Sequence, residues 1–350
     1  MKTNAILLTD GLLHLVYGKT AHGLISGMSR FPIQAVIDPI HVGKDAGVVT
    51  DGKMRHIPIF ASVEEALSAL NPRPTHCIIG VATHGGRLIP SLLESLKVAI
   101  QQNLTIVNGL HELVSENPTL YPLLKQYGVE VIDIRKPKHS SQLHMWEGKI
   151  QNVVTPRIAV LGTDCAIGKR TTCQKLTQAC NQQGIKTEMI YTGQTGWLQG
   201  FQYGFIFDST LNDFVSGELE HAIVSCVNEA NPELILIEGQ SALRNPSGPC
   251  GSEFILSGGA KNVILQHTPG RQYFNHGNKV KYPLPSLVDE IALIKAYGAE
   301  VLAITLNTGS LNNETWQAAK QRIHLETGLP VVCPREEGVA DLIPIIRGVL

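Results

Sequence analysis

One glycine-rich segment restricts the possible folds of this chain more than any other feature. Residues 157–161 form an apolar run, residues 162–168 have a glycine at each end, and a helical pattern begins at Lys169. A strand that turns directly into a helix leaves the first backbone N–H groups of that helix unpaired, at the positive end of its dipole. Such groups bind phosphate oxygens, and glycines let the backbone approach the anion closely. The segment therefore predicts a phosphate-binding loop on an open α/β sheet.

This segment has the features of a P-loop, with two departures from the usual pattern. Five residues rather than four lie between the first glycine and the Gly-Lys pair, and Arg170 rather than a hydroxyl residue follows Lys169. The lysine supplies a charge for a terminal phosphate, but the sequence leaves open whether Thr171 or Thr172 would meet Mg²⁺. We expect the whole loop to bind the cofactor: Gly162, Thr163, Asp164, Cys165, Ala166, Ile167, Gly168, Lys169, Arg170, Thr171 and Thr172.

A carboxylate stands at the end of a later strand. The apolar run 234–237 leads into Glu238-Gly239. In an open α/β sheet, the carboxyl ends of the strands face the ligand crevice, where a carboxylate can hold Mg²⁺ or its water. Without a ligand, Glu238 would simply end its strand.

Two short motifs together resemble dethiobiotin synthetase and its P-loop relatives. They are Gly-Thr-Asp at residues 162–164 and Glu-Gly at residues 238–239. The resemblance implies ATP with Mg²⁺ as cofactors, and Asp164, Glu238 and Thr171 as the residues on the metal side. Arg170 interrupts the lysine–threonine pair of that enzyme, which argues against the same ATP chemistry here.

Short apolar runs alternate with helical patterns along both halves of the chain, which is typical of βαβ units on a parallel sheet. A polar segment at residues 135–152 separates the halves. We therefore predict a Rossmann-like domain over residues 1–150 and a P-loop NTPase-like domain with a mostly parallel sheet over residues 151–350. The glycine fingerprint of NAD-binding domains does not follow the first predicted strand, so NAD is not favoured. Strands are expected at residues 5–8, 34–37, 57–60, 76–81, 104–107, 129–134, 157–161, 187–191, 234–237, 262–266, 301–306 and 329–333.

The composition excludes several classes of function. Hydrophobic residues make up 43% of the chain and charged residues 17%, and the net charge is -1, so neither disorder nor nucleic-acid binding is indicated. Apolar runs stay shorter than the roughly 18 residues of a membrane helix. The seven cysteines include no Cys-x-x-Cys pair, which disfavours disulfides and structural zinc. We expect a cytoplasmic homo-oligomer that acts on a small molecule, without nucleic-acid or membrane partners.

Four motifs in a fixed order resemble one family over nearly the whole chain. They are residues 162–172, Thr-Gly-Gln-Thr-Gly at 192–196, Glu-Gly-Gln-Ser at 238–241 and His-Thr-Pro-Gly-Arg at 267–271. The pattern is similar to that of the DgcN-type family, formerly domain of unknown function 1611, which is associated with N-acetylation of D-glutamate. This resemblance implies acetyl transfer from acetyl-CoA to the amine of an acidic D-amino acid. It also implies a first half similar to CoA-binding Rossmann domains, and the P-loop can hold either ATP or CoA phosphate.

Acetyl transfer requires a base for the ammonium proton and groups that grip the substrate carboxylate. Glu238 and His267 are the candidate bases, and Arg244 and Arg271 are the candidate clamps. His267 could instead cap its strand, and Arg271 could be a solvated loop residue. Two other functions stay open: an ATP·Mg²⁺-dependent ligase or kinase of a small carboxylate, and a nucleotide-gated regulatory or metallochaperone module. The lack of a histidine- or cysteine-rich tract counts against the metallochaperone.

Overall fold

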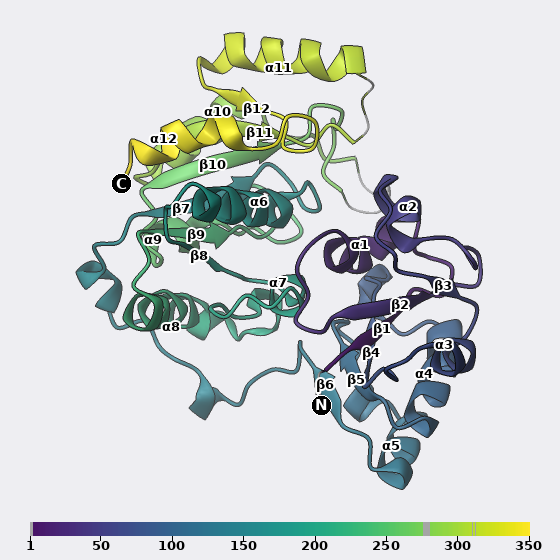
Figure 1. Cartoon of the computed structure of the whole chain (residues 1–350). Coiled ribbons are helices and arrows are strands. Elements are labelled where there is room, and N and C mark those ends of the chain that lie inside the picture. The colour runs from purple at the N-terminus through teal and green to yellow at the C-terminus, as the bar shows by residue number, and fades with distance from the viewer. Residues whose placement is uncertain (1–2, 276–280, 310, 312) are drawn as a thin grey trace. The chain divides into compact units, whose positions relative to one another are not determined.

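The computed structural model describes residues 3–275, 281–309, 311 and 313–350, and it contains two α/β units (Figure 1). Unit 1 comprises Met1–Pro137 and Gln194–Phe201, and unit 2 comprises Lys138–Gly193 and Gln202–Leu350. The division after residue 137 falls inside the polar segment 135–152, near the expected boundary at residue 150. The sequence did not indicate that residues 194–201, which come from the second half, pack with unit 1.

Unit 1 is the expected Rossmann-like domain. Its six strands are all parallel and lie in the order β3-β2-β1-β4-β5-β6, which is the order of dinucleotide-binding folds. The strands are β1 (Ala5–Leu8), β2 (Ile33–Ile37), β3 (Ile59–Phe60), β4 (His76–Ile79), β5 (Thr105–Asn108) and β6 (Val131–Asp133). The helices are α1 (Lys19–Ser26), α2 (Ala46–Asp51), α3 (Val63–Ala69), α4 (Pro90–Gln101), α5 (Tyr121–Tyr127) and α7 (Gln194–Leu198).

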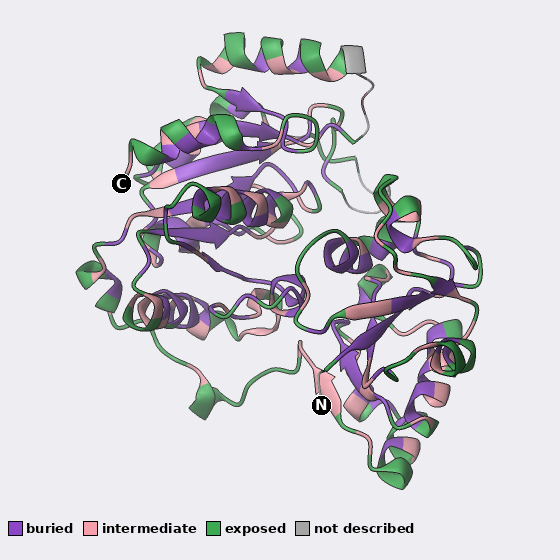
Figure 2. Ribbon diagram, viewed as in Figure 1, coloured by how far each residue is buried: buried purple, intermediate pink, exposed green. Residues whose placement is uncertain are grey.

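Both faces of the unit 1 sheet are covered by helices. Successive side chains of a strand point to opposite sides, so each strand contributes to two cores. Ile6 and Leu8 of β1 belong to the core beneath α3 and α4, whereas Ala5 and Leu7 belong to a second core beneath α1. Figure 2 shows the strands of this sheet as largely buried. Burial on both faces explains why the strands read as continuous apolar runs rather than as alternating ones.

Unit 2 is the expected P-loop domain, and its six strands are also all parallel, in the order β12-β11-β10-β7-β9-β8. The strands are β7 (Arg157–Gly162), β8 (Thr187–Ile190), β9 (Leu234–Glu238), β10 (Asn262–His267), β11 (Glu300–Leu306) and β12 (Val331–Val332). The helices are α6 (Lys169–Gln182), α8 (Asn212–Ala230), α9 (Ser252–Leu256), α10 (Leu287–Ala296), α11 (Asn313–Thr327) and α12 (Ile343–Arg347).

The strand order of unit 2 determines where its functional residues meet. β7 lies between β9 and β10, and all three strands run in the same direction. The loop after β7, Glu238 at the end of β9 and His267 at the end of β10 therefore lie along one edge of the sheet. Ligands of open α/β sheets bind at this edge, where the direction of strand addition changes.

No helix in the described ranges is both long and apolar enough to cross a bilayer.

A buried carboxylate closes the first loop of unit 1. Asp38, at the end of β2, is fully buried, and its Oδ2 accepts hydrogen bonds from Thr9 Oγ1 at 2.8 Å and from the N–H groups of Gly11 and Leu13, both at 3.1 Å. Its Oδ1 lies 2.9 Å from His41 Nδ1. Burial opposes the charge of Asp38, but these hydrogen bonds outweigh it and lower the pKa of the carboxyl group. An acidic residue that could otherwise bind a ribose is thus committed to the protein's own loop.

We expect Asp38→Asn to destabilise the protein by about 2–4 kcal/mol at pH 7, because an amide group would face donors that only a carboxylate satisfies. Urea unfolding measures this loss, with the exposed Asp341→Asn as the matched control. Since the pKa of Asp38 is lowered in the folded state, its contribution is full above about pH 4 and is lost as the pH falls further. A loss below about 0.5 kcal/mol at pH 7 would contradict this account of the loop.

Candidate functional site

The P-loop of unit 2 folds around the side chain of its own lysine. Lys169, the first residue of α6, is buried, and its Nζ donates hydrogen bonds to the carbonyl oxygens of Asp164 at 2.6 Å and Ser241 at 2.7 Å. A Cβ on Gly162 would lie 2.8 Å from the Lys169 side chain, so this glycine is needed for the close approach. Gly168 has a φ of 101°, a conformation that favours glycine. Burial lowers the pKa of Lys169, and nearby acidic groups oppose that shift.

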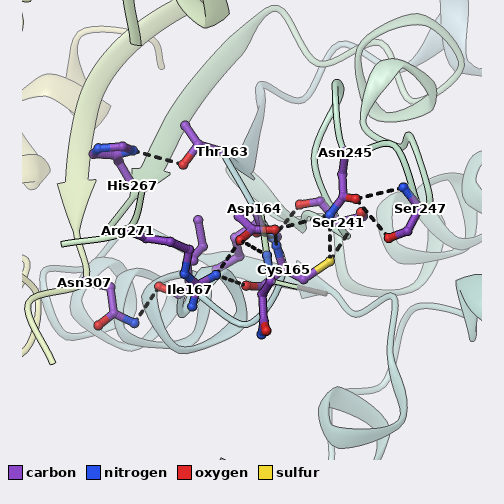
Figure 3. Close-up of polar contacts among 12 residues, drawn as sticks. Thr163, Asp164, Cys165, Ile167, Ser241, Asn245, Ser247, His267, Arg271 and Asn307 are labelled. Carbon is purple, nitrogen blue, oxygen red and sulfur yellow. Dashed lines mark hydrogen bonds and ion pairs between the residues drawn. The ribbon is translucent and has the colours of Figure 1, made fainter. Parts of the chain in front are cut away.

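Asp164 lies at the centre of the polar network of the loop (Figure 3). The residue is fully buried, and its Oδ2 accepts hydrogen bonds from Arg271 at 2.5 Å and from the N–H of Asn275 at 2.9 Å. Its Oδ1 accepts from the N–H of Cys165 at 2.6 Å and from Asn245 Nδ2 at 3.2 Å. Both oxygens are therefore engaged by the protein, and Asp164 holds the loop together instead of presenting an open ligand.

Glu238 is a second buried carboxylate of this site. Its Oε2 accepts a hydrogen bond from the N–H of Thr192 at 3.0 Å, and its carbonyl oxygen accepts one from Thr192 Oγ1 at 2.8 Å. Gln240 Nε2 donates to the same threonine hydroxyl at 3.0 Å. Burial raises the pKa of Glu238, and the nearby Arg170 guanidinium is the main opposing influence. A buried carboxyl group with a raised pKa is suited to accept a proton near neutral pH.

His267 is joined to the loop through a threonine. Its Nδ1 lies 3.0 Å from Thr163 Oγ1 (Figure 3), and burial lowers the pKa of the imidazole to about 4. The ring is therefore neutral at pH 7. Its neighbour Gln266 uses one side-chain oxygen to accept hydrogen bonds from Thr172 Oγ1 at 2.6 Å and Thr305 Oγ1 at 2.7 Å.

The structure places the three residues predicted to bind Mg²⁺ in different surroundings. Thr171 is exposed, whereas Asp164 and Glu238 are buried, and the hydroxyl of Thr172 is committed to Gln266. Arg271 occupies one oxygen of Asp164. Within the described ranges, no three histidine, cysteine, aspartate or glutamate side chains gather as they would around a metal ion.

The two candidate arginine clamps have different surroundings. Arg271 lies at the loop, where it also donates to the carbonyl oxygen of Cys165 at 2.9 Å. Arg244 instead pairs with the buried Glu290 of α10, its Nε lying 2.7 Å from the carboxylate oxygen, and donates to the carbonyl oxygen of Ser286. Its guanidinium stabilises a buried charge, because Glu290 would otherwise be unpaired. The structure thus gives Arg244 an ion pair with Glu290, and its role as a clamp stays a prediction.

Sequence reasoning missed several polar residues that support the loop. Asn245 contacts Asp164 and the sulfur of Cys165, and Asn307 Nδ2 donates to the carbonyl oxygen of Ile167 at 2.9 Å. Asn307 directly follows β11, so the rule that strand ends face the ligand could have found it. Ser241 ends the Glu-Gly-Gln-Ser motif at residues 238–241, whereas the sequence carries no comparable signal for Asn245.

Comparisons with known proteins agree with this architecture. Residues 39–137 match a Rossmann-like domain described as Domain of unknown function (DUF1611_N), and residues 144–343 match the P-loop domain described as Domain of unknown function (DUF1611_C). A crystal structure of a DUF1611 family protein from Anabaena variabilis is similar with a TM-score of 0.87 and 30% sequence identity, and the match covers 99% of each chain.

Two curated relatives carry a functional name. The chain is similar to a D-glutamate N-acetyltransferase from Tritonibacter scottomollicae, with 29% identity over 279 residues, or 78% of this chain and 81% of the relative. It is also similar to a D-glutamate N-acetyltransferase from Pseudoalteromonas sp, with 27% identity over 271 residues, or 76% of this chain and 79% of the relative.

We expect the buried pair of Asp164 and Arg271 to be energetically coupled. Arg271→Ala would leave a buried carboxylate without its cation, and Asp164→Asn would remove the charge that Arg271 neutralises. Each single change should destabilise the protein, whereas the double variant should lose about 1–3 kcal/mol less than the sum of the two. Urea unfolding of the four proteins gives this coupling energy. Strict additivity would mean that the ion pair does not organise the loop.

Proposed function

The chain belongs to the DUF1611 family, and we propose that it is an N-acetyltransferase that moves an acetyl group from acetyl-CoA to the α-amine of an acidic D-amino acid, with D-glutamate as the first candidate. The names of two relatives, each matched over more than three quarters of both chains, support the reaction class. The observation that carries the proposal is the buried Glu238, a carboxyl group of raised pKa beside a P-loop. The P-loop would then anchor phosphate and Glu238 would accept a proton, both at the same edge of the unit 2 sheet.

The loop would position the acetyl donor through its phosphate. Backbone N–H groups at the start of α6 and the ammonium group of Lys169 are donors that suit a phosphate ester of CoA. Lys169 donates to two carbonyl oxygens, and a phosphate oxygen would be a stronger acceptor because it is charged.

The chemistry requires the substrate ammonium to lose two protons. The amine nitrogen attacks the thioester carbonyl carbon, the carbon–sulfur bond breaks, and CoA leaves as the thiol. One proton goes to the leaving sulfur, and the other goes to the base and then to solvent. Glu238 fits the part of the base better than His267, because burial raises the pKa of Glu238 and lowers that of His267 to about 4.

A free-thiol assay with purified protein, acetyl-CoA and D-glutamate tests the reaction, with and without ATP·Mg²⁺. We expect thiol release that depends on D-glutamate and not on ATP, and mass spectrometry should identify the N-acetyl product. If no thiol is released but ADP forms when small carboxylates are added, the protein is instead an ATP-dependent ligase or kinase. If neither thiol nor ADP forms but ATP binds, a nucleotide-gated regulatory module is favoured.

Replacement of the proposed base should slow the chemical step. We expect Glu238→Gln to lower kcat by about 10²–10⁴-fold, with little change in the KM for acetyl-CoA, because general base catalysis is worth that much. In the wild type, kcat/KM should fall as the pH drops below the raised pKa of Glu238, since only the carboxylate accepts a proton.

Two matched variants serve as controls for this experiment. Glu188→Gln removes a half-buried carboxyl group from β8 and should leave kcat unchanged. His267→Gln should cost less than Glu238→Gln, because an imidazole of pKa about 4 is a weak base. A larger loss for His267→Gln would transfer the role of base to the histidine.

A further inference from the structure

Arg170 occupies an unusual position for a P-loop residue. It follows the loop lysine, where the common pattern has the hydroxyl that holds Mg²⁺. Its Nε is buried and has no hydrogen-bond partner within the described part of the chain. Burial lowers the pKa of this guanidinium, and the Glu238 carboxylate opposes the shift. The residue as a whole is half-buried, but a buried donor without a partner is costly unless a ligand completes its hydrogen bonds.

A second guanidinium, that of Arg271, binds Asp164, which is the other carboxylate that was expected to face a metal. Arg271 contacts Asp164 Oδ2 at 2.5 Å and the carbonyl oxygen of Cys165 at 2.9 Å, so it is attached to the loop itself. Both positions that a magnesium ion would need, the hydroxyl after the lysine and the aspartate, are therefore occupied or blocked by arginine.

The charges around the loop favour an anion that carries no metal. Lys169, Arg170 and Arg271 supply three positive charges, and the buried carboxylates Asp164 and Glu238 supply at most two negative ones. Burial raises the pKa of Glu238 and so disfavours its charged form. The exposed Asp208 also lies within the electrostatic reach of Glu238, but water screens it. A magnesium ion would add two positive charges to a site that already has an excess.

We propose that this loop binds a phosphate or diphosphate group without a divalent cation, with Arg170 in the place of the metal and Arg271 as a second guanidinium at the loop. Guanidinium groups suit this role because one guanidinium can bind two phosphate oxygens at once and stays charged when buried. Arg170 is then the residue that selects a metal-free phosphate ester over a magnesium nucleotide. The choice of CoA as the natural ligand rests on the proposed function, whereas the metal independence does not.

Calorimetric titration with inorganic pyrophosphate, in EDTA and in Mg²⁺, tests the metal independence directly. For the wild type we expect the two Kd values to agree within about twofold. Arg170→Thr restores the hydroxyl of the common motif; it should weaken binding in EDTA by about tenfold or more, and Mg²⁺ should restore part of the loss. Arg170→Lys keeps the charge but cannot bind two phosphate oxygens at once. Its Kd in EDTA should therefore lie between those of the wild type and Arg170→Thr.

Arg347→Thr is the matched control, because this arginine lies on α12 and donates to the carbonyl oxygen of Gln183 at the far end of α6. Its Kd should equal that of the wild type, and thermal unfolding should show that all variants are folded. Wild-type binding that is more than tenfold weaker in EDTA, an unchanged Kd for Arg170→Thr, or no pyrophosphate binding at millimolar concentration would each overturn the proposal.

The same titration with CoA separates this proposal from the proposed function. Metal-independent binding of pyrophosphate, combined with no acetyl transfer to D-glutamate, would leave the arginine site standing and refute the acetyltransferase. If the protein transfers acetyl groups but binds CoA only with Mg²⁺, the acetyltransferase proposal stands and the metal-free arginine site is refuted.

Discussion

The buried carboxylate of Asp164 is the interaction on which the rest of the site depends. It joins the P-loop to Asn245, which follows β9, and to Arg271 and Asn275, which follow β10. A buried carboxylate is costly unless several donors surround it, so each of these segments must take one position to supply its donor to Asp164. The conformation of the loop, including the carbonyl oxygen that receives Lys169, follows from this requirement.

The two buried carboxylates of unit 2 do different work because their surroundings differ. Asp164 receives four donors, one of them a guanidinium, and these fix it in the framework of the loop. The side chain of Glu238 receives a backbone N–H from Thr192, and burial raises its pKa. Different surroundings therefore give two carboxyl groups of one site different tasks.

The arginines of this unit show how position in the fold decides the role of a residue type. Arg244 neutralises Glu290 against α10, Arg271 neutralises Asp164 at the loop, and Arg170 keeps a buried donor unused. A guanidinium remains charged in each place, so its contribution depends on which acceptors the fold brings to it. In the proposed metal-free site, Arg170 and Arg271 would replace the metal that a hydroxyl and carboxylates share in the common pattern.

The sequence by itself determined the features that depend on neighbours in the chain. The strand, glycine loop and helix at residues 157–182, the two α/β halves and the carboxylate at the end of β9 were all predictable, because turns, caps and apolar runs are local signals. Tertiary structure decided the partners. Arg271 and Asp164 are separated by 107 positions, and Arg244 and Glu290 by 46. It also decided that Thr172 rather than Thr171 turns inward and that residues 194–201 pack with unit 1. Those contacts follow from the order of the strands and the packing of side chains between them, which the spacing of residues along the chain does not encode.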